Sequence, residues 1–142
     1  TEFSTTINLA LKPQRIARAF SELRCTFGGR SIVPDVSVFT GSRIVRDENG
    51  EVANIFPIAP DWVVEILSPD QSQTKVTKNI LHCLNNGTEM GWLIDPAEKT
   101  IFVYLPGQQP LVFDRSEQQL PMPSFARDIQ LTVEAVFNWL LD

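Results

Sequence analysis

Residues 61–69, written DWVVEILSP, limit the possible folds more than any other part of this chain. The consecutive apolar residues Trp62, Val63 and Val64 break the alternation expected of a strand with one solvated face. Such a run is typical of a central strand that is covered on both faces. Residues 68–72 then stop the strand and offer several candidate N-caps for a helix. The stretch therefore predicts a buried sheet followed directly by a helix.

Glu65 interrupts this apolar strand. Since side chains alternate along a strand, Glu65 shares one face with Val63 and Leu67. An ionised carboxylate buried there without a partner costs several kcal/mol or more. An ion pair, a raised pKa or a divalent cation could compensate the charge. For a glutamate considered alone, an ion pair or a strand end that reaches solvent is the ordinary explanation.

The remaining patterns predict helices and strands in alternating blocks. Helical spacing of apolar residues occurs at 3–11, at 73–86 before Gly87, and at 133–140. Strands are expected at 19–27, 31–39, 91–96, 100–105 and 111–113. This order predicts one α/β or α+β domain over residues 1–142, with a mixed central β-sheet flanked by helices. Because the helical spacing is present from Phe3, we expect a further segment before Thr1.

Composition narrows the class of protein. The 142 residues are 43% hydrophobic and 20% charged, which is typical of a globular domain. No apolar run approaches the roughly 20 residues of a membrane-spanning helix, so we expect no membrane association and a cytoplasmic location. Cys25 and Cys83 lack metal-ligand spacing and are expected to be reduced core residues. The net charge of −5 argues against a general affinity for nucleic acid.

Two further residues are expected to lie near Glu65. Asp35 follows Pro34 at an interruption of the strand predicted at 31–39, and Lys75 lies at the start of the helix after Glu65. Two acids on adjacent strands with a nearby lysine form an oxygen-ligand site suited to Mg²⁺ or Mn²⁺. Such an ion activates water and binds a phosphate oxygen, while the lysine stabilises the transition state or orients the attacking water. Spacing alone leaves this as one hypothesis among several.

Four short motifs occur in a fixed order: VPDV at 33–36, VEILSP at 64–69, a helix ending in NG at 86–87, and GWLIDP at 91–96. In this order the chain resembles a large bacterial family of putative restriction endonucleases with the PD-(D/E)xK nuclease fold. The similarity covers roughly residues 15–125.

The resemblance implies a four-stranded mixed sheet flanked by helices. It also implies that Asp35 and Glu65 are the metal-binding acids and that the main-chain carbonyl of Ile66 is an additional ligand for Mg²⁺ or Mn²⁺. Nucleic acid, and DNA in particular, would be the partner. Restriction-type nucleases often act as dimers, so a homodimer is expected.

The lysine departs from the family pattern. The wider superfamily has it two residues after the second acid, where this chain has Leu67, and the family has it eight residues before the glycine that ends the helix, where this chain has Asn79. Lys75 lies one turn before Asn79 on the same helix face, whereas Lys78 is rotated by about 100°. We therefore predict Lys75 as the catalytic lysine. The prediction places the two carboxylates roughly 4 to 6 Å apart, with the Lys75 amine within one side-chain length.

Several other residues are weaker candidates. Glu22 is a possible extra ligand or water-holding group, although an exposed or ion-paired strand residue is its ordinary role. His82 is expected to be a hydrogen-bonded structural residue. Arg43 and Arg46 could contact a phosphate, with a solvated loop as the default. Trp92 is expected to pack the sheet against a helix.

The leading functional hypothesis is a Mg²⁺-dependent endonuclease that hydrolyses phosphodiester bonds. The alternative is a binding or structural module that keeps the fold without efficient chemistry, as the loss of lysine at both usual positions suggests. A different metal-dependent phosphoesterase is a third possibility.

Overall fold

A computed structural model describes residues 1–141. Three α-helices are present in this part of the chain: α1 (Glu2–Leu11), α2 (Gln73–Leu84) and α3 (Val133–Leu141). The strands are β1 (Ala17–Ser21), β2 (Arg24–Phe27), β3 (Arg30–Ile32), β4 (Val36–Thr40), β5 (Ile55–Phe56), β6 (Trp62–Ile66), β7 (Met90–Asp95), β8 (Thr100–Tyr104) and β9 (Leu111–Phe113). Short 3-10 turns lie at Gly41–Arg43 and Ser124–Ala126.

The main sheet has six strands in the order β1-β4-β6-β7-β8-β9. β6 and β7 are parallel and are joined through α2, whereas the other neighbouring pairs are antiparallel. The expectation of a mixed sheet flanked by helices is therefore confirmed. The expectation of four strands is wrong, because the hairpin of β8 and β9 continues the sheet beyond β7.

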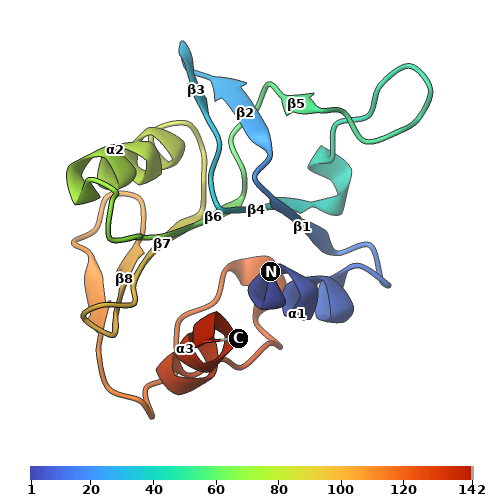
Figure 1. The fold of residues 1–142 in the computed structure, drawn as a ribbon. Coiled ribbons are helices and arrows are strands. Elements are labelled where there is room, and N and C mark those ends of the chain that lie inside the picture. The colour runs from blue at the N-terminus through green and yellow to red at the C-terminus, as the bar shows by residue number, and fades with distance from the viewer. Residues whose placement is uncertain (142) are drawn as a thin grey trace.

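Helices cover both faces of this sheet (Figure 1), with α1 and α3 together on one face and α2 on the other. A three-stranded sheet, β3-β2-β5, lies on the same side as α2. The core is accordingly divided into two clusters. The first cluster, beneath α1 and α3, contains Phe3, Ile7, Trp62, Val64 and Trp92. The second, beneath α2, contains Val63, Ile80, Cys83 and Leu93.

Local sequence explains where the helices lie. In α1, Phe3, Ile7 and Leu11 are buried at helical spacing, and the Thr1 side chain caps the helix by accepting from the Ser4 amide. In α2, the Ser72 hydroxyl accepts from the Lys75 amide. The predicted helix at 73–86 is confirmed to within two residues.

Gly91 allows α2 to pack closely on the sheet. A Cβ atom at this position would lie 2.6 Å from Cγ2 of Ile80 and 3.3 Å from Cγ1 of Val63. Any other residue would therefore push the helix away from β7. This close packing brings the residues of α2 next to the main sheet.

Two predicted strands are each split in the structure. The strand expected at 19–27 breaks at Glu22, whose φ of 51° is left-handed, so that β1 belongs to the main sheet and β2 to the small one. The strand expected at 31–39 breaks at Pro34 and Asp35 into β3 and β4. Both breaks occur where the chain passes from one sheet to the other.

The hairpin between β2 and β3 turns at Gly28 and Gly29, with φ values of 56° and 76°. Two successive left-handed residues are the requirement of a type I′ turn, which glycine meets without strain. Within residues 1–141, no helix has the length and apolar character needed to cross a membrane.

Candidate metal centre and active site

Asp35 and Glu65 are held together by reciprocal hydrogen bonds. The Asp35 amide donates to Oε1 of Glu65 at 2.8 Å, and the Ile66 amide donates to Oδ2 of Asp35 at 2.6 Å. Each carboxylate thus binds the main chain at or next to the other acid. Because β4 and β6 are neighbours in the sheet, the two side chains converge at one end of this strand pair.

Glu65 lies on the α2 face of β6, as the alternation of the strand predicts. Its neighbours in alternation, Val63 and Leu67, pack in the second cluster, whereas Val64 and Ile66 pack in the first. Glu65 is only 5% exposed. Among residues 1–141 neither Glu65 nor Asp35 forms an ion pair with a basic side chain. The buried charge is therefore left without the ordinary compensation.

The pKa values of both acids respond to this environment. Burial raises the pKa of Glu65 to about 7, the Asp35 amide opposes this rise, and the neighbouring Asp35 charge adds to it. Burial likewise raises the pKa of Asp35, against the hydrogen bond from the Ile66 amide, and the charge of Glu22 raises it further. Both carboxylates therefore resist ionisation where no positive charge compensates them.

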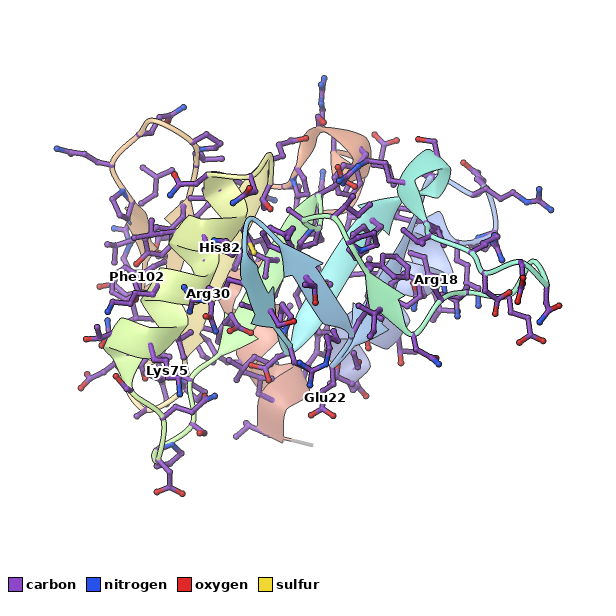
Figure 2. All side chains as sticks on the ribbon, turned by 90° about the horizontal axis from the view of Figure 1, so that it is seen from above. Arg18, Glu22, Arg30, Lys75, His82 and Phe102 are labelled. Carbon is purple, nitrogen blue, oxygen red and sulfur yellow. The ribbon has the colours of Figure 1, made fainter. Side chains whose placement is uncertain are left out.

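Asn79 connects this pair to α2 and to the hairpin. Its Nδ2 donates to Oε2 of Glu65 at 3.5 Å, and its Oδ1 accepts a hydrogen bond from Nη2 of Arg30. Arg30 belongs to β3 and is far from Asn79 in sequence. Figure 2 shows Arg30 beside α2, on the same side of the sheet as Lys75 and His82.

Comparison with known proteins decides the family. The sequence family described as "Putative restriction endonuclease" (Uma2) matches residues 1–134. The chain belongs to this family.

A solved structure supports the same assignment. The crystal structure of a putative nuclease belonging to DUF820 from Anabaena variabilis ATCC 29413 is 65% identical to this chain, with a TM-score of 0.94. The similarity covers 98% of this chain and 78% of that one. The mixed α/β fold is thus that of a family associated with nucleases. No curated protein matches this chain.

The family pattern makes the position of the two helix lysines informative. Lys75 and Lys78 are both exposed, and within residues 1–141 neither side chain forms an ion pair or a hydrogen bond. Lys75 lines a hollow of about 420 Å³ at the start of α2, together with Asp70, Ser72 and Asn79. It therefore lies at the rim of the candidate site, and its catalytic role stays a prediction.

Glu22 does not lie in a strand, contrary to expectation. It occupies the turn between β1 and β2, where its amide donates to the Asp35 carbonyl at 3.3 Å. Its side chain is exposed, yet its charge acts on Asp35 as described above. Figure 2 places Glu22 at the edge of the molecule below the hairpin. Glu22 can contribute charge at this edge, whereas its role as a ligand stays a prediction.

His82 is held in a structural contact. Its Nε2 lies 2.9 Å from the Phe27 carbonyl, and its ring stacks on the Phe27 ring with centroids 4.6 Å apart. Trp92 packs in the first core cluster against Phe3 of α1, with ring centroids 5.8 Å apart. Arg43 forms an ion pair with Asp61 at 2.8 Å and donates to the Ala59 carbonyl, and a contact with phosphate stays a prediction.

Arg30 is the residue that sequence reasoning missed. No spacing rule connects it to Asn79, because the contact depends on how the hairpin packs on α2. Asn79, at the position where the resemblance implies a lysine, and the glycine pair that closes the hairpin are the sequence signals closest to this contact.

Proposed function

We propose that this protein hydrolyses phosphodiester bonds in DNA, using a divalent cation bound by Asp35 and Glu65. The observation that carries the proposal is the reciprocal hydrogen bonding of two acids that have no basic partner among residues 1–141. Membership of a restriction endonuclease family supports the same chemistry.

The donor set fits a hard cation such as Mg²⁺ or Mn²⁺. It consists of the two carboxylates, with the Ile66 carbonyl as the predicted additional ligand. No group of three His, Cys, Asp or Glu side chains suited to a metal occurs in residues 1–141. Mg²⁺ is commonly bound through one or two carboxylates and keeps several of its waters. Burial raises the pKa of the neighbouring Cys83 thiol to about 12, so the thiol is protonated when no metal is bound.

When bound, the cation would activate a water molecule and neutralise charge on the phosphate. The residues of the chain prepare the place for it. The main-chain amides of Asp35 and Ile66 fix the two carboxylates, and the Asn79 amide holds the second oxygen of Glu65. Lys75, at the rim, would contact a phosphate oxygen.

A basic pocket supports DNA as the partner despite the net charge of −5. The pocket has a volume of about 510 Å³ and is lined by Lys12, Arg15, Arg18 and Arg46, together with Ala17, Gly41 and Ile44. None of these cations forms an ion pair within residues 1–141, so a polyanion would relieve their mutual repulsion.

The strand register relates this pocket to the acids. Ala17 pairs with Thr40 at the pocket end of β1 and β4, while Ser21 pairs with Val36 at the end next to Asp35. Four residues of strand correspond to about 13 Å, or roughly four base pairs along a duplex. One duplex could therefore contact both ends of the strand pair.

The decisive experiment is cleavage of supercoiled plasmid by purified protein with Mg²⁺, Mn²⁺ or Ca²⁺. We expect nicking with Mg²⁺ or Mn²⁺ and its loss, by about 1,000-fold or more, in Asp35→Asn and Glu65→Gln. The exposed acid variant Glu98→Gln is the matched control and should cleave like the wild type. Cleavage that persists in both site variants would place the activity elsewhere.

DNA binding tests the basic pocket separately. In Ca²⁺, the variant Arg15→Gln/Arg18→Gln should bind a duplex more weakly than the wild type. The slope of its binding constant against salt concentration should correspond to about two fewer phosphate contacts. The control Arg115→Gln/Arg127→Gln removes two arginines that do not line the pocket. Equal binding by the two double variants would exclude the pocket as a DNA contact.

A binding module without efficient chemistry is the second candidate, because Leu67 and Asn79 occupy both usual lysine positions. Duplex binding in Ca²⁺ without cleavage in Mg²⁺ or Mn²⁺ would favour it. A homodimer and a cytoplasmic location stay predictions. Analytical ultracentrifugation with and without duplex tests the first, and fractionation of cells tests the second.

A further inference from the structure

Arg30 is connected to the candidate metal centre through Asn79, although it lies on β3 and not on α2, where the resemblance implies a lysine. Arg30 donates through Nη2 to Oδ1 of Asn79, and Asn79 donates through Nδ2 to Glu65. The resemblance implies a lysine at the helix position that Asn79 occupies. Asn79 thus donates a hydrogen bond to Glu65, and the positive charge of Arg30 on β3 contacts Asn79.

The hairpin that carries Arg30 is fastened to α2 at a second place. The Phe27 carbonyl and ring contact His82, and a Cβ atom on Gly28 would lie 2.9 Å from the side chains of both His82 and Asn86. Gly28 is therefore required for the close approach of the turn. His82 lies about one helical turn beyond Asn79, so this contact fixes the height at which Arg30 meets the helix.

The chemistry of arginine limits what Arg30 can do. A guanidinium stays protonated at all ordinary pH values, so Arg30 cannot act as a general base. It can orient Asn79 and place a fixed positive charge one side chain away from Glu65. Those are the electrostatic and orienting parts of the role predicted for the lysine.

We propose that Arg30, acting with Asn79, takes the place of the helix lysine of this family. Asn79 orients Glu65, and Arg30 orients Asn79 and supplies the positive charge. Arg30 is thereby a positioning residue. This inference rests on the proposed function, since the charge matters only if a cation and a phosphate bind at Asp35 and Glu65.

Calcium binding measured by calorimetry separates this role from a purely structural one. Arg30→Met removes the charge while keeping a side chain of similar length. Because a nearby positive charge repels a divalent cation, the variant should bind Ca²⁺ about threefold to tenfold more tightly than the wild type. A residue that only supported the local structure would, when removed, weaken Ca²⁺ binding instead.

Arg24→Met is the matched control. Arg24 is an exposed arginine on β2, in the same hairpin. The Arg24→Met variant should bind Ca²⁺ with the affinity of the wild type. Cleavage in Mg²⁺ should fall about 100-fold in Arg30→Met and remain unchanged in Arg24→Met.

Rescue provides the sharpest test. Asn79→Lys introduced into the Arg30→Met background restores the lysine of the family. It should recover cleavage to within about tenfold of the wild type and return Ca²⁺ affinity to its original value. Should Arg30→Met fail to fold, Arg30→Lys replaces it. That variant keeps the charge and loses the planar fork, so Ca²⁺ affinity should be unchanged while cleavage falls about tenfold.

Three results would overturn the inference: weaker Ca²⁺ binding by Arg30→Met, behaviour identical to Arg24→Met, or no rescue by Asn79→Lys. A wild-type protein that binds no Ca²⁺ contradicts the proposed function as well. Ca²⁺ binding and DNA cleavage by the wild type, with Arg30→Met equal to its control, contradicts the role of Arg30 alone.

Discussion

The two faces of β6 differ in that only one of them buries a charged side chain. On the face covered by α1 and α3, Trp62 and Val64 pack in a cluster of hydrophobic residues. Trp62, Trp92 and Phe3 form a group of edge-to-face contacts with ring centroids 5.0 to 5.8 Å apart. On the face covered by α2, the same strand buries Glu65 and connects it to Asp35 and Asn79.

This difference separates stability from chemistry within one strand. The first face gains free energy from burial of apolar surface and aromatic contacts, which do not depend on pH. The second face gives up part of that gain to keep an ionisable group out of water. A domain of this size can accept such a cost because its other face supplies a complete apolar core. The following changes test whether the two faces are as separate as this comparison implies.

Phe3→Ala should have the largest effect on stability. Phe3 is 1% exposed and contacts both tryptophans, so its truncation should lower the free energy of unfolding by about 3 to 5 kcal/mol. Urea denaturation measures this loss, and it should be equal at acid and at neutral pH. Leu9→Ala, at a position on the same helix that is 74% exposed, is the control and should change little. A loss that depends strongly on pH would contradict the separation.

Glu65→Gln should remove the part of the pH dependence of stability that is due to Glu65. The pKa of Glu65 is raised from 4.5 to about 7, so the folded state holds this proton more tightly than the unfolded state. The resulting stabilisation is complete below pH 4.5 and is lost as the pH rises through about 7. Its size is about 3 kcal/mol. The wild type should therefore become less stable across this range, measured by urea denaturation in the absence of divalent cations.

The glutamine variant lacks this titration, and the pH dependence that remains in it should be small and due to Asp35, whose pKa is also raised. The variant should overtake the wild type in stability above neutral pH. A wild-type protein whose stability rises from pH 4.5 to about 7 would show that Glu65 is not buried without compensation.

The elements that form the two faces differ in how well the sequence predicts them. β6, α2 and β7 were predictable because each has a local pattern: an apolar run, a helical spacing with a cap, and a second apolar run before Asp95 and Pro96. The placement of Glu65 on the face opposite Val64 followed from alternation alone.

The parts that depend on tertiary packing were not predictable. No glycine or proline marks the break at Glu22 in the sequence. The left-handed conformation there occurs where the chain passes from one sheet to the other. The contact between Arg30 and Asn79 joins a hairpin to a helix, and no local sequence pattern in either segment predicts it. The prediction of Lys75 uses helical spacing, which considers only residues on the same helix, and the catalytic role of Lys75 stays a prediction.

Calcium should stabilise the second face and leave the first unaffected. At about 100 times its dissociation constant, a ligand that binds only the folded state adds about 2.7 kcal/mol to the free energy of unfolding. We expect this increase for the wild type and for Phe3→Ala above neutral pH, where the acids ionise. It should be absent in Glu65→Gln, as measured by urea denaturation with and without Ca²⁺. An equal increase in Glu65→Gln would place the cation at another site.

The smallest expected effect concerns the cap of α2. The Ser72 hydroxyl accepts from the Lys75 amide at 3.3 Å, and its removal in Ser72→Ala should cost about 1 kcal/mol. Ser42→Ala is the control, because Ser42 is exposed and its side chain makes no hydrogen bond within residues 1–141. The Asn79 contact lies two turns into the helix, so fraying of the first turn should leave Ca²⁺ affinity within about twofold of the wild type. A larger loss of affinity would mean that the start of α2 belongs to the cation site and not only to its rim.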